Sequence, residues 1–419
     1  MKAVLIIADG LGGRPTDLAG KTCLEAASTP NLDQLASRGV LGLVDPIGPG
    51  VRPGSDTAHL SLFGYDPRQV YTGRGVFECF GIGMNVLPGD ICFRANLATA
   101  EKTPDGLKIT DRRAGRIDAG QDELASVLND IKLSVSPKIS FNFRPSTQHR
   151  GALLLRGHSI RLSSQVAEND PHVVGALVHE SKPNPDVIED AAARVTATAI
   201  NELTQRSFEL WSDHPVNRAR EQAGKPPANV LLLRGASDAP HLESIESAYH
   251  VKGAVIAGGA LYRGVSLACG MCQLDVDGAT GGLDTNLTAK AEAAVEALDT
   301  YDYVFIHVKG TDNAGHDQDA EGKRDFIERM DRELIGLLAQ RLDWSTTHIA
   351  ITGDHTTPID FGDHTPEPVP VLFAGPNVMP DAATVFDERA AAAGGLSRFS
   401  GQVLPMLLGY CNWSPKFGA

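Results

Sequence analysis

Five short apolar runs dominate the hydrophobic pattern of the chain, and each is followed by a turn or a polar cluster. They are KAVLIIA (2–8), AVIAGG (254–259), DYVFIHVKG (302–310), HIAITGD (348–354) and VPVLFAG (369–375). A run that is apolar at nearly every position, rather than at every second one, predicts a strand covered on both faces, as in a parallel sheet.

Stretches with helical periodicity separate several of these runs. They are STPNLDQLASRG (28–39), LTAKAEAAVEALDT (287–300) and KRDFIERMDRELIGLLAQRL (323–342). In the first we expect Thr29 to cap the helix, Pro30 to be its first residue and Gly39 to end it. Strands that alternate with helices predict an α/β domain with a mostly parallel sheet flanked by helices.

The middle of the chain has a different pattern. Between residues 79 and 229 the apolar segments are shorter and mixed with polar residues, as in ICFRANLATA and KISFNFRPSTQHRGALLLRG, and one long helix is expected at 190–211. We interpret residues 79–229 as a smaller α+β domain inserted into an α/β domain that comprises residues 1–78 and 230–419.

Composition excludes several classes of protein. No apolar stretch approaches the roughly 18 residues of a transmembrane helix, so no membrane partner is expected. The net charge of −14 argues against nucleic-acid binding, which needs a broad basic surface. Six cysteines in 419 residues are too few for a disulfide framework, and the first apolar run is too short for a signal peptide; both point to the cytoplasm.

Side chains suited to metal binding flank the predicted strands. They are Asp9, Asp312, His316, Asp354, His355 and His364. A single aspartate or histidine in such a loop usually serves a turn. Six that map to one edge of one sheet favour a ligand site, because ligands of open α/β sheets bind at that edge. Carboxylate and imidazole ligands suit a divalent ion such as Mn²⁺ or Zn²⁺, and two ions are feasible.

Ser55 begins a predicted helix in PGSDTAHLSLFGYDP (53–67), directly after a loop rich in glycine and proline. A serine at this position commonly caps the helix by accepting hydrogen bonds from free backbone N–H groups. The same position also suits a hydroxyl that attacks and then carries a phosphoryl group. Both interpretations can hold together, and the six metal-binding residues favour the nucleophile.

Several motifs resemble those of one family, in order from Lys2 to about Gly375. They include ADGLGGRP, KTCLEAASTPNLDQLASRG, PGSDTAHLSLFGYDP, VYTGRGVFE, DRRAGRI, ENDPH, GATGGLDT, HVKGTDNAGHD, GDHTTP and DHTPEPVPVL. Together they resemble the archaeal-type cofactor-independent phosphoglycerate mutases of the alkaline phosphatase superfamily. In that family a phosphatase-like domain is split by a substrate-binding domain, which agrees with the insertion expected at 79–229.

The resemblance implies an isomerase of glycolysis and gluconeogenesis. It would interconvert 2- and 3-phosphoglycerate through a phosphoserine, with two divalent metal ions and without 2,3-bisphosphoglycerate. The metals would be Mn²⁺ first, with Co²⁺, Zn²⁺ or Mg²⁺ as alternatives. Carried over to this sequence, Ser55 is the phosphoserine. One metal would be held by Asp9, Ser55, Asp354 and His355, and the other by Asp312, His316 and His364.

A mutase differs from a phosphatase in retaining the glycerate, which needs cations that bind a carboxylate and a phosphate. The candidates are Arg112, Arg113, Arg116 and Arg150 in the insertion, with Arg263 and Lys309 outside it. His149 is the candidate general acid or base. Two alternatives stay open: a metal-dependent phosphohydrolase or phosphonate-related enzyme of the same superfamily that acts on another small phospho-acid, and an inactive metal-binding scaffold.

Overall fold

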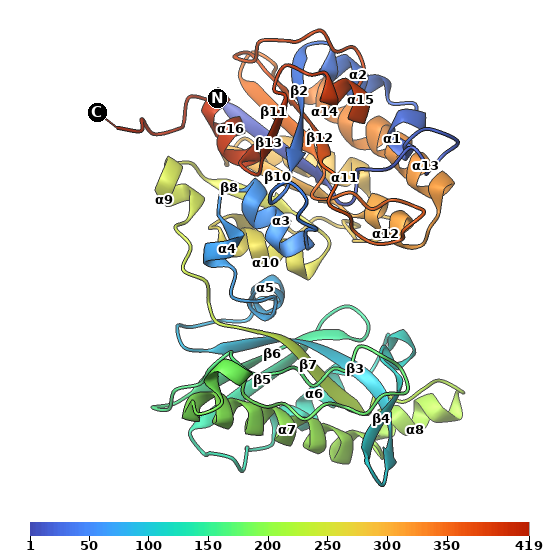
Figure 1. Ribbon diagram of the computed structural model, residues 1–419, viewed down its shortest axis with the longest axis vertical. Coiled ribbons are helices and arrows are strands. Elements are labelled where there is room, and N and C mark those ends of the chain that lie inside the picture. The colour runs from blue at the N-terminus through green and yellow to red at the C-terminus, as the bar shows by residue number, and fades with distance from the viewer. Residues whose placement is uncertain (419) are drawn as a thin grey trace. The chain divides into compact units, whose positions relative to one another are not determined.

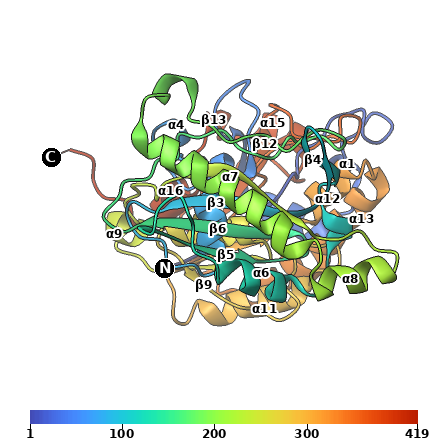
Figure 2. The same cartoon turned by 90° about the horizontal axis from the view of Figure 1, so that it is seen from below.

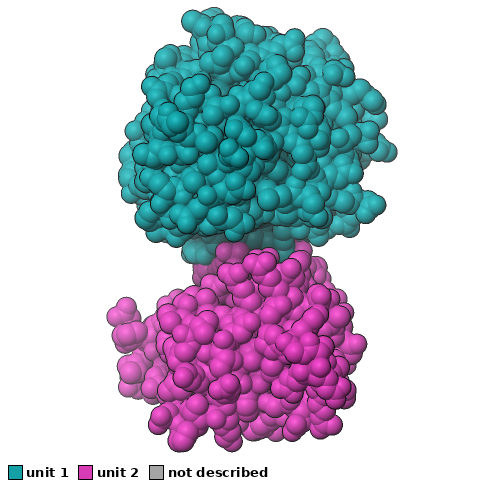
Figure 3. All heavy atoms as spheres, turned by 90° about the vertical axis from the view of Figure 1, so that its right-hand side faces the viewer, with its two compact units in different colours: residues 1–71, 242–419 teal, residues 72–241 magenta. Residues whose placement is uncertain are grey.

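A computed structural model describes residues 1–418 of the chain, which divides into two compact units. Unit 1 comprises residues 1–71 and 242–419, and unit 2 comprises residues 72–241; Figure 3 colours them separately. The chain therefore leaves unit 1 once, forms all of unit 2, and returns.

Unit 1 is built on an eight-stranded sheet (Figure 1). In sheet order its strands are β13 (Arg398–Ser400), β2 (Gly39–Asp45), β12 (Val369–Ala374), β11 (Thr347–Thr352), β1 (Lys2–Ala8), β10 (Tyr303–Val308), β8 (Gly253–Ile256) and β9 (Cys272–Gln273). All neighbouring pairs are parallel except the two that involve β12, which runs antiparallel to β11 and to β2. The predicted α/β fold with a mostly parallel sheet is confirmed.

Helices flank this sheet on both faces. The helices of unit 1 are α1 (Cys23–Ala26), α2 (Pro30–Ala36), α3 (Ser55–Leu62), α4 (Pro67–Val70), α9 (Ile245–Tyr249), α10 (Ala260–Ala268), α11 (Leu287–Ala297), α12 (Gly310–His316), α13 (Ala320–Met330), the π-helical turn η3 (Asp331–Ile335), α14 (Gly336–Arg341), α15 (Glu388–Ala392) and α16 (Val403–Tyr410). Helices α2, α11, α13 and α14 share one apolar core with β1, β10 and β11. Helices α3 and α10 bring His59 and Tyr262 against the opposite face of β10, at Phe305 and His307.

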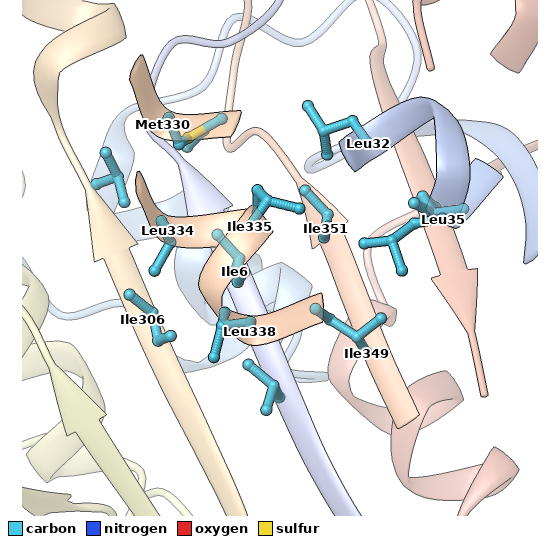
Figure 4. Close-up of a cluster of buried hydrophobic side chains, with 14 of the residues drawn as sticks. Ile6, Leu32, Leu35, Ile306, Met330, Leu334, Ile335, Leu338, Ile349 and Ile351 are labelled. Carbon is cyan, nitrogen blue, oxygen red and sulfur yellow. The ribbon is translucent and has the colours of Figure 1, made fainter. Parts of the chain in front are cut away.

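The larger core of unit 1 explains why the central strands are apolar throughout. Ile6, Ile306 and Ile351 point toward one face and meet side chains from α2, η3 and α14 (Figure 4). The intervening residues, such as Leu5 and Phe305, are equally buried on the other face. Burial on both faces removes the alternation that a half-exposed strand would show.

The antiparallel direction of β12 positions the loop that precedes it. Thr352, at the end of β11, pairs with Val371 near the start of β12. The residues before β12 therefore lie at the same sheet edge as the residues that follow β11, β1 and β10. The sequence analysis predicted that His364 precedes a strand. Because that strand, β12, is antiparallel to β11, His364 lies at the sheet edge where the other candidate ligands were expected.

One local prediction for unit 1 needs correction. Helix α2 ends at Ala36, and Gly39 is the first residue of β2 instead of the helix terminator. A Cβ at Gly39 would lie 2.5 Å from the carbonyl oxygen of Phe373, so the close approach of β12 requires glycine there. After Gly375 the chain forms α15, β13 and α16.

Unit 2 contains a five-stranded antiparallel sheet. Its strands are β4 (Gly106–Asp111), β3 (Ile91–Thr103), β6 (Arg150–Gly157), β5 (Ile139–Pro145) and β7 (Val230–Ser237), which pairs with β3. The helices are α5 (Gly75–Gly81), η1 (Ala114–Arg116), α6 (Gln121–Asn129), η2 (Pro185–Val187), α7 (Ala191–Trp211) and α8 (Pro215–Gln222). Helices α6 and α7 cover one sheet face, and α7 runs obliquely across the strands in Figure 2.

The boundaries of unit 2 differ from the expected 78/79 and 229/230 and fall at 71/72 and 241/242. Strand β7 was expected in the α/β domain. It pairs instead with β3, in a register that runs from Val230 opposite Ala98 to Ser237 opposite Cys92. Helix α5 also belongs to unit 2, because Val76 N–H donates to Ser237 Oγ at 2.7 Å. Contacts between segments that are distant in the sequence, namely β7 with β3 and α5 with β7, account for both boundaries.

Among residues 1–418, no helix combines the length and apolar character that crossing a membrane requires.

Candidate active site

Three buried side chains meet where β1 and β11 end. Asp9 follows β1 directly, and Asp354 and His355 follow β11 after one glycine. Each is 0% exposed, and one potential ligand atom from each lies within 4.8 Å of the others. His355 Nε2 is 3.2 Å from Asp9 Oδ1 and 3.4 Å from Asp354 Oδ2. We call these three residues the first ligand group.

A second ligand group lies beside the first and consists of Asp312, His316 and His364. Asp312 and His316 are four residues apart on α12, so they share a helix face as the spacing predicted. His316 Nε2 and His364 Nε2 lie 3.3 Å and 3.6 Å from Asp312 Oδ1. The ring of His364 stacks on that of His355 at 3.5 Å between centroids, which joins the two groups.

The unmet polar atoms of the first group fit a divalent cation. Asp9 Oδ1 and Asp354 Oδ2 are buried and receive no hydrogen bond from any described residue. Burial raises the pKa of Asp354 well above its ordinary value, and the neighbouring Asp9 carboxylate adds to the effect. Burial also opposes ionisation of Asp9, but Lys309, His307 and His355 outweigh it and hold its pKa well below the usual range. Such oxygens, crowded and poorly solvated, are suited to a metal.

Ser55 is the first residue of α3, and its hydroxyl faces the first ligand group. Ser55 Oγ lies 3.3 Å from His355 Nε2. The expected capping role is wrong, because Gly54 is the N-cap residue and the helix has no side-chain cap. The hydroxyl is therefore available to a ligand at the N-terminus of α3, where the helix dipole favours an anion.

Of the two cations expected outside the insertion, the structure places Lys309 at the site. Lys309 Nζ donates to Asp9 Oδ2 at 3.0 Å and to Asp312 Oδ2 at 2.6 Å, so one ammonium bridges both ligand groups. Arg263, on α10, donates from Nε to the carbonyl oxygen of Ala257. A substrate-binding role for Arg263 stays a prediction.

Three aromatic side chains behind the first ligand group were missed by the sequence analysis. His307 Nε2 is 3.1 Å from Asp9 Oδ2, and Tyr262 stacks on the His307 ring at 3.5 Å. His59 Nδ1 lies 3.5 Å from Asp354 Oδ2. Burial lowers the pKa of His307 to about 4 and that of His59 to about 3. A histidine inside the otherwise apolar strand YVFIHV was the available signal for His307.

In unit 2, the predicted arginines lie in different environments. Arg112 donates two hydrogen bonds to Asp170, at 3.0 Å and 2.7 Å. Arg113 and Arg116 are exposed around η1. Arg150 lies opposite Asn96 in the β3–β6 pair. Its positive charge contributes to lowering the pKa values of Arg94 and Glu78.

His149 precedes β6 and is only 5% exposed. Its Nδ1 atom has no hydrogen-bond partner among the described residues. Burial, together with the charges of Arg150 and Arg113, lowers the pKa of His149 to about 4. Near neutral pH the imidazole is therefore uncharged and able to accept a proton.

The sequence analysis also missed a cationic cluster on the sheet face opposite α6 and α7, in which Arg94 and Arg234 are partly buried and Arg150 is exposed. Arg94 and Arg234 are directly opposite each other in the β3–β7 pair, and Asn96 follows on the same face. Arg94 Nε, Arg234 Nε and Asn96 Oδ1 are buried without hydrogen-bond partners. We call Arg94, Asn96, Arg150 and Arg234 the arginine face. The polar residues at alternate positions in ICFRANLATA were the signal for it.

Several charged side chains act on Arg94. Burial, together with the charges of Arg74, Arg234 and Arg150, lowers the pKa of its guanidinium to about 9, and Glu78 opposes them. Arg94 Nη1 lies 3.6 Å from Glu78 Oε1 and Arg234 Nε lies 3.8 Å from Asp170 Oδ2, while both Nε atoms are buried without a hydrogen-bond partner among the described residues. Such an arrangement favours an anionic ligand.

Full-length relatives decide the family. The chain is 47% identical to a 2,3-bisphosphoglycerate-independent phosphoglycerate mutase of Methanopyrus kandleri, over 100% of this chain and 98% of the relative. It is 46% identical to one of Methanothermobacter thermautotrophicus, over the full length of both. The chain belongs to the 2,3-bisphosphoglycerate-independent phosphoglycerate mutases.

Two further comparisons agree with this assignment. A family model described as 2,3-bisphosphoglycerate-independent phosphoglycerate mutase matches residues 36–217. Among solved structures, a cofactor-independent phosphoglycerate mutase of Thermoplasma acidophilum aligns with 98% of this chain and 100% of its own, with 34% identity and a TM-score of 0.68. A protein of Pyrococcus horikoshii aligns with 100% of this chain and 99% of its own, with 38% identity and a TM-score of 0.84.

Membership in this mutase family confirms the resemblance and the prediction of an isomerase. Two groups of candidate metal ligands lie in unit 1, and His355 of the first group is 3.3 Å from the Ser55 hydroxyl. In unit 2, Nε of Arg94 and Nε of Arg234 are buried without hydrogen-bond partners among the described residues.

Proposed function

We propose that the chain interconverts 2- and 3-phosphoglycerate through a phosphoserine at Ser55. The observation that carries the proposal is the position of the Ser55 hydroxyl, 3.3 Å from His355 Nε2 at the start of α3. A serine hydroxyl is a weak nucleophile unless a neighbouring group activates it. The buried ligands around Ser55 provide a place for that activation.

We assign one metal to Asp9, Asp354 and His355 together with Ser55, and the other to Asp312, His316 and His364. The supporting evidence is the grouping of these ligand atoms and the unmet oxygens of Asp9 and Asp354. Bound divalent ions, with Mn²⁺ the first candidate, would lower the pKa of the hydroxyl and neutralise charge on the phosphoryl oxygens. Carboxylate and imidazole ligands are compatible with Mn²⁺, Co²⁺ and Zn²⁺.

Residues of the chain itself perform the remaining tasks. Lys309, which bridges Asp9 and Asp312, is placed to bind a phosphoryl oxygen with its third N–H. His149 is proposed to accept a proton from one glycerate hydroxyl and return it to the other, because its buried Nδ1 atom has no hydrogen-bond partner among the described residues.

The arginine face is proposed to retain the glycerate. Arg94 and Arg234 offer buried N–H donors to a carboxylate or phosphate, and Asn96 Oδ1 offers an acceptor to a hydroxyl. A phospho-hydroxy-acid presents all of these groups. Retention distinguishes a mutase from a phosphohydrolase, which must release its alcohol product. The buried Nε–H groups of Arg94 and Arg234, which have no hydrogen-bond partner among the described residues, therefore favour the mutase over the hydrolase alternative.

Trapping the intermediate tests the proposal. The Mn²⁺-loaded protein is mixed with 3-phosphoglycerate, quenched in acid, digested and analysed by mass spectrometry. We expect one added phosphoryl group on the peptide that contains Ser55, and none in the Ser55→Ala variant. Phosphorylation at a different residue, or turnover with no phosphopeptide at any quench time, would rule out the phosphoserine at Ser55.

A further inference from the structure

Thr357 lies between the two ligand groups without belonging to either. It follows β11 and is two residues beyond His355. Its Oγ1 is 2.9 Å from His355 Nδ1 and 3.1 Å from Asp312 Oδ1. One hydroxyl thus contacts a residue of the first group and a residue of the second.

The surroundings of Thr357 hold this hydroxyl in one place. The residue is 0% exposed. A Cβ at Gly10 would lie 2.7 Å from Thr357 Oγ1, and one at Gly315 would lie 2.8 Å from its Cγ2. Both glycines are needed to make room for the threonine. Lys323 Nζ, itself buried, donates to the carbonyl oxygen of Thr357 at 2.8 Å and to that of Gly12 at 2.9 Å, which fixes the backbone.

Hydrogen-bond counting assigns the direction of both contacts. A carboxylate only accepts, so the single hydroxyl proton of Thr357 must go to Asp312 Oδ1. The hydroxyl oxygen then accepts from His355, which places the imidazole proton on Nδ1. The lone pair of His355 is left on Nε2, the atom that faces Asp9, Asp354 and Ser55.

We propose that Thr357 is a positioning residue, whose hydroxyl sets the tautomer of His355 for metal binding and orients the Asp312 carboxylate at the same time. A metal-bound histidine generally donates its other ring N–H to an acceptor of this kind. Here that acceptor is also a donor to the neighbouring ligand group. The inference rests on the metal assignment of the proposed function.

Without the Thr357 hydroxyl, each ligand group loses one hydrogen bond. His355 has no acceptor for its Nδ1–H, so the tautomer with the proton on Nε2 becomes accessible, and that tautomer has no lone pair for a metal. Asp312 loses one of the donors that fix its orientation. Loss of a hydrogen bond to a metal-ligating side chain typically lowers metal affinity by about 10- to 100-fold.

Isothermal titration of the metal-free protein with Mn²⁺ tests the proposal. We expect wild type to bind two ions, Thr357→Val to bind both about 10- to 100-fold more weakly, and Thr357→Ser, which keeps a hydroxyl, to recover most of the affinity. Thr196→Val is the matched control. Thr196 is also buried in its unit, accepts from Ser163 N–H and donates to the Ala192 carbonyl, yet it contacts no ligand-group residue.

The outcomes separate this inference from the proposed function. Wild-type affinity in Thr357→Val overturns the role of Thr357 and leaves the metal assignment intact. Failure of wild type to bind Mn²⁺ removes the metal assignment, and the inference with it.

A second measurement needs only the wild-type protein, in case Thr357→Val does not fold. The ¹⁵N spectrum of histidine-labelled, Zn²⁺-loaded protein reports which nitrogen of His355 carries the proton, with the resonance assigned by its absence in His355→Gln. The proposal requires a protonated Nδ1. A proton on Nε2 would contradict it.

Discussion

The hydroxyl oxygen of Ser55 lies 3.3 Å from Nε2 of His355, although 300 residues separate them in the chain. Helix α3 presents the hydroxyl at its first residue, and the end of β11 presents the imidazole. This contact connects the proposed nucleophile with the first ligand group, and the first two predictions below depend on it.

Ser55→Ala should abolish mutase turnover, with a loss of about 10³-fold or more, because the substitution removes the hydroxyl proposed to carry the phosphoryl group. The fold should be retained, since the Ser55 side chain makes no capping hydrogen bond. A coupled assay for 2-phosphoglycerate and a circular dichroism melt measure the two properties. Ser61→Ala, on the same helix, is the control and should remain active. An active Ser55→Ala variant would contradict the assignment.

Removal of metal should inactivate the protein reversibly. Chelation leaves Asp9, Asp312 and Asp354 buried together without a compensating ion, so the melting temperature should fall with activity. Adding back Mn²⁺ or Co²⁺ should restore both, because an ion that binds only the folded state stabilises it, by about 2.7 kcal/mol at 100 times its dissociation constant. Full activity after exhaustive chelation would disprove the metal assignment.

Arg94→Met should weaken substrate binding by about tenfold or more, the effect of losing one charge-assisted hydrogen bond. Mn²⁺ binding should be unchanged, because Arg94 lies in unit 2 and the ligand groups lie in unit 1. Steady-state kinetics with 3-phosphoglycerate and a metal titration separate these effects. Arg194→Met, which removes an exposed arginine paired with Glu189, is the control. An unchanged KM and kcat in Arg94→Met would exclude the arginine face from the substrate site.

Glu388 should make stability depend on pH. Its carboxylate accepts from Gly13 N–H and from the Thr22 hydroxyl, and burial raises its pKa from 4.5 to about 7. The folded state keeps the proton that the unfolded state loses above pH 4.5, so this group's stabilising contribution is full below pH 4.5 and is lost as the pH rises to 7. The maximum loss is about 3 kcal/mol.

Glu388→Gln removes this titration, because an amide resembles the protonated acid. Urea unfolding of both proteins between pH 5 and 8 measures the difference. Relative to Glu388→Gln, wild type should lose stability from pH 5 to 7 and then stay level. A constant difference across this range would show that Glu388 does not titrate there.

The sequence predicted the structure correctly where a residue pattern has a single physical explanation. The apolar runs 2–8, 303–308, 347–352 and 369–374 form strands because burial on both faces requires such runs. The spacing of Asp312 and His316 indicated a shared helix face, and the short helix α12 provides it.

Pairing between distant segments was not accessible to the sequence analysis. Strand β7 resembles the strands of unit 1 in composition, but its register with β3 places it in unit 2. The same register brings Arg234 opposite Arg94. Nothing in the sequence around either arginine predicts that the two lie side by side. Lys323 and Thr357 were missed for a related reason, because a polar side chain is expected at the surface until its buried partners are known.

The most direct test of the central claim is ³¹P NMR of the Mn²⁺-loaded protein with 3-phosphoglycerate and no 2,3-bisphosphoglycerate. The mutase account predicts that 2-phosphoglycerate appears and reaches a stable equilibrium with little free phosphate. Free phosphate as the main product would contradict it, because the phosphoserine would then be hydrolysed instead of returned to the glycerate.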